Sequence, residues 1–168
     1  MMETVRGRIW KFGDDVNTDV IFPGKYTYTI TDPQEMARHA MEDADPEFAV
    51  KVEPGDIVVG GRNFGCGSSR EQAVGALRYA GVGAIVAVSF ARIYFRNAVN
   101  LGLPAIVCPE AAAAAQPGDE MTIRFTDGVI EVRGGAYTFP SFPDFMLAIL
   151  SDGGLIPHLR KKTVDRRP

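Results

Sequence analysis

The amino-acid sequence, 168 residues long, predicts one compact α/β domain with a mostly parallel central sheet and an added hairpin. Three short apolar runs, at 57–59, 84–88 and 104–108, are separated by segments with helical periodicity, and strands that alternate with helices favour a parallel sheet. Later, residues 121–133 alternate apolar and polar side chains around Asp127-Gly128, which predicts the hairpin. No linker divides the chain, so the whole of it is expected to form a single domain.

The first third opens with a strand and a polar loop. Residues 5–12 alternate apolar and charged side chains, which predicts the strand. The turn formers at 13–19 indicate a loop, and 20–22 is a brief apolar step that stops at Pro23-Gly24. Asp32-Pro33 then predicts a helix start, with aspartate as N-cap and proline at the first helical position, and this helix ends near residue 43.

The middle and end of the chain continue the alternation. Helices are predicted at 70–80 and 91–101, because apolar residues recur there at helical spacing and a glycine follows each segment. Residues 111–115 indicate a short helical turn, and 142–150 a closing helix. The basic residues near the end indicate a flexible tail at about 158–168.

Composition and charge exclude several classes of function. The formal net charge is −3, so nucleic acid is not an expected partner. No run approaches the roughly 18 to 20 apolar residues of a membrane helix, and the start shows no secretory signal, so we expect a cytoplasmic protein with no membrane partner. Cys66 and Cys108 should stay reduced there, and two cysteines cannot hold an iron–sulfur cluster unaided. Because His39 and His158 add no metal-ligand spacing, we expect no metal and no cofactor on this chain.

The segment Asn63-Phe64-Gly65-Cys66-Gly67-Ser68-Ser69-Arg70-Glu71 is the candidate site. It follows a buried strand and leads into a helix, where free N–H groups and the helix dipole favour an anion. Gly65 and Gly67 let the backbone approach a ligand, and Arg70 can grip a carboxylate with two parallel hydrogen bonds.

The same segment has a purely structural interpretation. Ser68 and Glu71 fit a capping box, in which the serine caps the helix and the glutamate reaches back, and the spacing alone slightly favours this reading. Nucleotide binding is weakly supported, because no lysine follows the glycines as in a P-loop and Arg70 breaks the dinucleotide-binding pattern.

Three blocks of the sequence resemble the swivel domain of the aconitase superfamily, most closely the small subunits of 3-isopropylmalate dehydratase. They are Asn17-Thr18-Asp19-Val20-Ile21-Phe22-Pro23, Asn63 to Ala73, and Ser89-Phe90-Ala91-Arg92-Ile93-Tyr94-Phe95-Arg96-Asn97 continuing to Pro104. The blocks occur in the order and spacing of that family, and the resemblance covers nearly the whole chain. It implies a subunit of a hydro-lyase that isomerises 2-isopropylmalate to 3-isopropylmalate in leucine biosynthesis, by loss and re-addition of water.

The resemblance also implies residue roles and a partner. Ser68 matches the serine that removes a proton next to a carboxylate, Ser69 and Arg70 match carboxylate-holding residues, and Asp19 matches an active-site aspartate. A [4Fe–4S] cluster is implied on a large partner subunit, without which this chain is expected to be inactive. We expect residues 17–29 to be mobile until that subunit docks, and self-association of the chain when it is isolated is an open alternative.

The second block is expected to be mainly structural. Phe90, Ile93, Tyr94 and Phe95 have the helical spacing typical of a core. The polar residues of this segment are expected to brace the fold or the subunit contact, and we do not place them in the site: Arg92, Arg96, Asn97 and Asn100.

Two departures from the family pattern bear on the substrate. Gln72 stands where isopropylmalate enzymes usually have histidine, and it is more similar to homoaconitases. The loop that discriminates substrates contains Lys25 and Tyr28, which we include among the expected substrate-binding residues, and it has no arginine from 24 to 37 to meet a third carboxylate. Isopropylmalate is therefore the leading substrate, with 2,3-dimethylmalate and homoaconitate as alternatives, and a non-catalytic binding domain as an alternative of another class.

Overall fold

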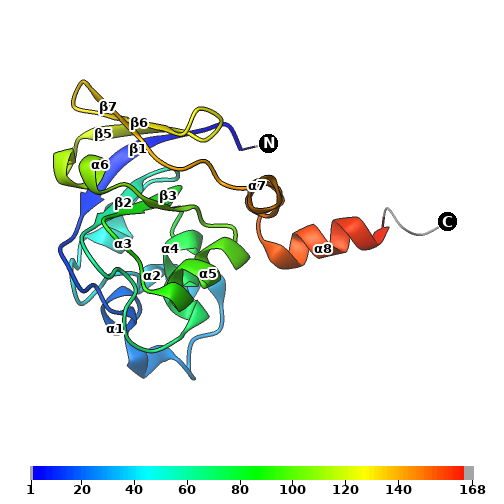
Figure 1. Cartoon of the computed structure of the whole chain (residues 1–168). Helices are drawn as coiled ribbons and strands as arrows, with labels where there is room; N and C mark the ends of the chain where they lie inside the picture. The colour runs from blue at the N-terminus through cyan, green and yellow to red at the C-terminus, as the bar shows by residue number, and fades with distance from the viewer. Residues whose placement is uncertain (1, 165–168) are drawn as a thin grey trace.

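A computed structural model describes residues 2–164, and within them seven strands form one mixed sheet in the order β4-β3-β2-β1-β5-β6-β7 (Figure 1). The strands are β1 (Thr4–Lys11), β2 (Ile57–Gly60), β3 (Ala84–Ala87), β4 (Ala105–Val107), β5 (Glu120–Arg124), β6 (Val129–Val132) and β7 (Gly135–Thr138). The pairings from β4 to β1 are parallel, whereas β1, β5, β6 and β7 pair antiparallel. The parallel half and the hairpin of β5 and β6 confirm the predicted α/β fold class.

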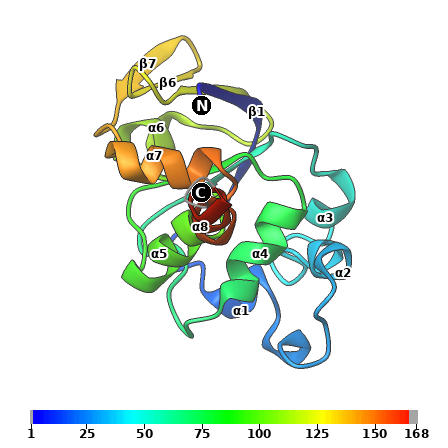
Figure 2. The same ribbon diagram turned by 90° about the vertical axis from the view of Figure 1, so that its right-hand side faces the viewer.

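Helices cover both faces of the sheet (Figures 1 and 2). They are α1 (Thr18–Ile21), the 3-10 helix η1 (Gly24–Tyr26), α2 (Pro33–Arg38), α3 (Phe48–Lys51), α4 (Glu71–Tyr79), α5 (Arg92–Asn100), α6 (Pro109–Ala114), α7 (Asp144–Ser151) and α8 (Leu155–Val164). Alternate residues of β2 and β3 point into two separate cores, because successive side chains of a strand face opposite ways. Val58 and Ile85 belong to the core under α4 and α5, and Val59 and Val86 to the core under α6 and the hairpin.

Most predicted elements are present, with small shifts at their ends. The Asp32 side chain accepts a hydrogen bond from the Glu35 N–H at 2.9 Å, which confirms the predicted N-cap of α2. That helix ends at Arg38 rather than near residue 43. Residues 20–22 were expected to be a simple apolar step, but helix α1 occupies 18–21, because the Asn17 side chain accepts from the Val20 N–H at 3.0 Å and caps it.

The predicted flexible tail is wrong for residues 158–164, which belong to helix α8, and residues 165–168 lie outside the described part of the chain. Gly153 and Gly154 have φ of +86° and +126°, so they reverse the chain and let a second helix begin where the sequence suggested an end. His158 of α8 is buried and its Nδ1 lies 2.6 Å from the Asp152 carboxylate, which Lys161 also contacts. Helix α8 packs on α5 and α7 and leads away from the sheet (Figure 1).

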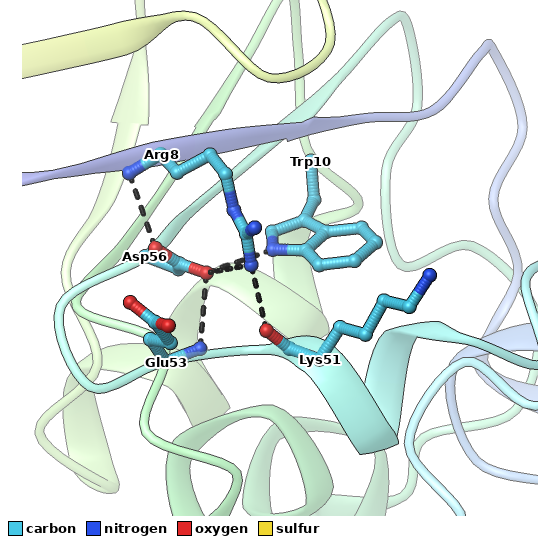
Figure 3. Close-up of polar contacts among 5 residues, drawn as sticks. All are labelled: Arg8, Trp10, Lys51, Glu53 and Asp56. Carbon is cyan, nitrogen blue, oxygen red and sulfur yellow. Dashed lines mark hydrogen bonds and ion pairs between the residues drawn. The ribbon is translucent and has the colours of Figure 1, made fainter.

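A buried carboxylate joins β1 to the turn before β2 (Figure 3). Asp56, 4% exposed, accepts hydrogen bonds from the Arg8 N–H (3.1 Å), the Trp10 indole N–H (2.9 Å) and the Glu53 N–H (3.0 Å), and the Arg8 guanidinium lies 3.3 Å away. Burial opposes the charge, but the hydrogen bonds from Glu53, Trp10 and Arg8 outweigh it and hold the pKa of Asp56 below its ordinary value.

Residues 2–164 contain no helix that is both long enough and apolar enough to pass through a membrane.

Candidate active site

Three loops meet at the carboxyl ends of β1, β2 and β3. The Phe64 N–H donates to the Ser89 carbonyl at 3.0 Å, and the Gly65 N–H donates to the Val16 carbonyl at 2.7 Å. The Thr18 N–H donates to the Cys66 carbonyl at 2.8 Å. The carboxyl edge of a parallel sheet is where ligands bind in open α/β folds. The three sequence blocks that carry the resemblance therefore converge at one place.

The glycine loop is shaped by close packing on α5. Gly65 has φ of +81°, and a Cβ atom there would lie 2.1 Å from Cγ of the buried Tyr94 ring. Gly67 has φ of +93° and is exposed. Tyr94 donates from its hydroxyl to the Ala73 carbonyl at 3.3 Å, and complete burial raises the pKa of Tyr94 far above its ordinary value, so it stays neutral. The buried Tyr94 ring thus packs directly against the loop backbone at Gly65.

A pocket of about 440 Å³ opens above this loop. Its lining consists of Thr18, Gly65, residues 67–70, residues 91–94, Arg96 and Asn97. Such a volume suits a small ligand rather than a macromolecule. Four of the predicted site residues, Gly67, Ser68, Ser69 and Arg70, are among these lining residues. Arg92, Arg96 and Asn97, which the sequence analysis did not place in the site, line the same pocket.

Arg70 is the most strongly held polar side chain of the pocket. It forms a close ion pair with Asp19, and it donates to the Thr27 hydroxyl at 2.9 Å and, more weakly, to the Thr18 hydroxyl at 3.4 Å. Its side chain is 13% exposed, and the buried Nε has no partner among the described residues. Asp19, a candidate catalytic residue, thus lies beside Arg70. The anchoring threonines were not predicted, because hydroxyl contacts across some 50 residues leave no local pattern.

Ser68 is exposed at the mouth of the pocket and does not cap α4. The Thr18 hydroxyl donates to the Ser68 carbonyl at 2.9 Å, which keeps this residue in the loop. The N-cap of α4 is Arg70, with extended backbone and no side-chain cap hydrogen bond. The capping box of Ser68 and Glu71 is therefore wrong: the helix begins at Glu71, and Ser68 lies two residues before the cap. Its hydroxyl is left available to a ligand.

Lys25 and Tyr28 lie away from this pocket. Lys25 pairs with Glu42 at 3.7 Å and lies over the Tyr26 ring, with its nitrogen 5.0 Å from the ring centre. Tyr28 is 95% exposed. Neither side chain lines the pocket, although Thr27 between them reaches Arg70. The loop therefore contacts Arg70 through Thr27, whereas Lys25 and Tyr28 are exposed to solvent.

The described residues do not fit an iron–sulfur cluster. Among residues 2–164, no group of three or more His, Cys, Asp or Glu side chains is arranged to hold a metal ion. Cys66 belongs to the glycine loop, whereas Cys108 is buried in the core under α6, with its Sγ 3.6 Å from the Thr138 carbonyl. Burial raises the pKa of the Cys108 thiol, which keeps it protonated.

Comparison with known proteins decides the family. The aconitase C-terminal domain family matches residues 14–111, the segment that contains all three loops of the site. The chain belongs to the aconitase C-terminal domain family. It is 54% identical to the methanogen homoaconitase small subunit of Methanothermobacter thermautotrophicus, over 96% of this chain and 93% of that protein. It is 51% identical to the 3-isopropylmalate dehydratase small subunit of Moorella thermoacetica, over 94% and 96%.

A solved structure of the same family has the same fold. The crystal structure of a 3-isopropylmalate dehydratase from Methanocaldococcus jannaschii superimposes with a TM-score of 0.91 and 42% identity, covering 97% of both chains. The fold of this chain is thus shared with that structure along nearly its entire length.

Proposed function

We propose that this chain is the small subunit of a hydro-lyase that isomerises 2-isopropylmalate to 3-isopropylmalate by dehydration and rehydration. The observation that supports it most is the pocket itself: Ser68, Ser69 and Arg70 line one small cavity at the carboxyl edge of the sheet of an aconitase C-terminal domain. The name of the Moorella relative supports isopropylmalate as the substrate and a large subunit as the partner.

In the proposed reaction, Ser68 removes a proton from the carbon next to a substrate carboxylate, and a hydroxyl leaves the neighbouring carbon. Rehydration with the opposite regiochemistry completes the isomerisation. A free serine hydroxyl is far too weakly acidic to ionise at neutral pH, so it needs positive potential nearby. The guanidinium of Arg70 and the uncapped start of α4 lie next to it in the chain and supply that potential. The same groups stabilise charge that develops on the carboxylate.

Arg70 holds that carboxylate in the proposal, together with Ser69. In the free chain the guanidinium faces Asp19, Thr18 and Thr27, so three partners fix its plane before a substrate arrives. A preorganised planar fork loses little freedom when it binds a carboxylate. We assign assistance to the departing hydroxyl to the large subunit, on which the [4Fe–4S] cluster is expected. The described residues of this chain do not fit such a cluster.

Homoaconitate is the second candidate substrate. Two observations favour it: the 54% identical relative named as a homoaconitase small subunit, and Gln72, which follows Glu71 in the first turn of α4. The loop argues against it, because residues 24–37 contain no arginine for a third carboxylate and the exposed Tyr28 stands where one is expected. 2,3-Dimethylmalate is a dicarboxylate like isopropylmalate, so a site for two carboxylates could bind either acid, and both are included in the test.

Reconstitution tests the proposal. The chain is mixed with its large subunit, and turnover is measured on 2-isopropylmalate, 2,3-dimethylmalate and homocitrate. We expect no activity from the chain alone and activity of the pair on 2-isopropylmalate. Ser68→Ala should abolish turnover while the two subunits still co-elute, whereas Ser141→Ala, an exposed serine outside the pocket, should leave turnover unchanged. Near-normal turnover by Ser68→Ala would refute the assignment of Ser68 as the base. If the pair acted only on homocitrate, homocitrate would replace 2-isopropylmalate as the assigned substrate.

A further inference from the structure

Helix α5 begins with a positive charge at the place where a helix favours a negative one. Arg92 is its first residue, the first turn contains no acidic residue, and the N-cap Ala91 has no side chain that could bond the free N–H groups. Partial positive charge at a helix N-terminus disfavours a cation by roughly 0.3–1 kcal/mol. Nothing in the helix itself therefore explains an arginine at this position.

A second arginine lies one turn further on the same helix. Arg96 is four residues after Arg92, and residues at this spacing are neighbours on a helix surface, where like charges repel. Both side chains are exposed and both line the 440 Å³ pocket. Within residues 2–164, neither guanidinium has a carboxylate partner, and no Asp or Glu is among the residues that line this pocket.

Arg70, which also lines the pocket, differs in this respect. Its guanidinium already contacts a carboxylate of the same chain, that of Asp19. The two arginines of α5 are therefore the cations of the pocket lining that have no carboxylate partner among residues 2–164. They line the same pocket as Ser68 and Ser69, so a small ligand in the pocket can meet the two serines and the two guanidinium groups.

We propose that Arg92 and Arg96 bind the second carboxylate of the substrate, so that this one chain grips both ends of a dicarboxylate. Arg70 and Ser69 hold the carboxylate next to the carbon that loses its proton, and the α5 pair holds the other. An anion between Arg92 and Arg96 removes both the repulsion between them and the unfavourable charge at the helix start. The identity of the substrate in this assignment rests on the proposed function. The binding of a dicarboxylate by these arginines does not depend on it.

Binding to the isolated chain tests the inference without catalysis. Succinate and butyrate, matched in length but differing by one carboxylate, are titrated into the isotope-labelled chain and followed by NMR chemical shifts of residues 65–70 and 91–97. We expect succinate to bind more tightly than butyrate. Arg92→Gln should lower the affinity for succinate about tenfold, because a charge-assisted bidentate contact is lost, and should leave the affinity for butyrate unchanged. Arg96→Gln should act in the same direction.

Arg62→Gln is the matched control, because Arg62 is an exposed arginine of the same loop region that does not line the pocket. It should leave both affinities within twofold of the wild-type values. Equal affinities for succinate and butyrate in the wild-type chain overturn the proposal. So does a loss of succinate affinity in Arg62→Gln as large as in Arg92→Gln, because the effect would then be one of net charge.

The reconstituted enzyme gives a second readout. Arg92→Gln should raise KM for the substrate about tenfold with a smaller change in kcat, because it removes binding rather than proton transfer. An active wild-type pair whose KM is unchanged in this variant refutes the role of Arg92 while leaving the proposed function intact. A wild-type pair that turns over none of the three acids refutes the proposed function, and the succinate titration still decides the role of Arg92.

Discussion

Replacing Asp56 by asparagine tests the buried carboxylate that joins β1 to the start of β2 (Figure 3). All the partners of this carboxylate are donors: the Arg8 N–H bonds Oδ1, and the Trp10 indole, the Glu53 N–H and the Arg8 guanidinium bond Oδ2. An asparagine carbonyl can keep the contacts of Oδ2. Its NH₂ group then takes the place of Oδ1 and faces the Arg8 N–H, so two donors meet and the Arg8 N–H loses its acceptor. The substitution changes few atoms and removes both the charge and one acceptor.

The expected loss follows from these contacts. A buried donor without a partner costs about 1–3 kcal/mol, and bonds to a charged group exceed neutral ones by about 1 kcal/mol each. The Arg8 guanidinium adds little, because its side chain is 41% exposed and solvent screens it. We expect Asp56→Asn to lower the free energy of unfolding at pH 7 by about 3 kcal/mol, and Asp56→Ala by more, since it leaves the Trp10 and Glu53 donors unpaired as well.

The pH dependence gives a sharper test. The pKa of Asp56 in the folded chain lies below its ordinary value, so its charge stabilises the fold fully above the unfolded pKa of about 3.9 and ceases to do so as pH falls through the folded pKa. The difference between wild type and Asp56→Asn should therefore be largest near neutral pH and shrink below about pH 4.

The measurement is urea unfolding followed by circular dichroism at several pH values, with Asp43→Asn, an exposed aspartate, as the control. The control should change stability by a few tenths of a kcal/mol at most. Turnover of the reconstituted Asp56→Asn enzyme at low temperature should keep the wild-type KM, because Asp56 does not line the pocket. A loss below about 0.5 kcal/mol, or one that is equal at pH 3 and pH 7, would refute the argument from charge-assisted hydrogen bonds.

Two further predictions concern the pocket. Gly65→Ala should destabilise the chain by about 3 kcal/mol or more and abolish turnover, because a Cβ 2.1 Å from Tyr94 adds a clash to an unfavourable φ. Gly118→Ala, where φ is +83° and nothing lies within 4 Å of the added atom, should cost only about 1 kcal/mol in the same thermal unfolding experiment, and equal costs would contradict the clash. Arg70→Lys should raise KM of the reconstituted enzyme by at least about tenfold, since an ammonium cannot replace a planar fork, and a KM within twofold of wild type would count against the carboxylate grip.

Local patterns predicted the parts of the fold that depend on local chemistry. The runs at 57–59 and 84–88 are strands because β-branched and small apolar side chains fill both faces of a covered sheet. Asp127-Gly128 marks the turn between β5 and β6, where Gly128 has φ of +64°. By contrast, β7 at 135–138 was missed, because its short sequence is rich in glycine and small residues and is a strand only through its pairing with β6.

The capping box shows how a correct local rule can fail in context. Ser68 and Glu71 have the right spacing, and an isolated peptide with that sequence would gain from the cap. In the folded chain Thr18, fifty residues away, holds the Ser68 carbonyl, and Arg70 extends toward Asp19. These tertiary contacts move the helix start to Glu71 and leave the serine free. A rule for helix ends therefore competes with contacts that a short window of sequence does not contain.

The arginines of α5 show where the remaining information lies. Helical periodicity correctly predicted that Tyr94 faces the core, since it reports which side of a helix is apolar, but Ile93, which was expected there too, is 53% exposed. It says nothing about what the polar side meets. Arg92 and Arg96 line the pocket because the start of α5 lies against the glycine loop, where the Ala91 N–H donates to the Phe64 carbonyl at 3.0 Å. A cation at a helix start with no acidic neighbour is the one local signal that the sequence held for them. Unfavourable charge placement is therefore worth searching for wherever periodicity alone assigns a helix to the core.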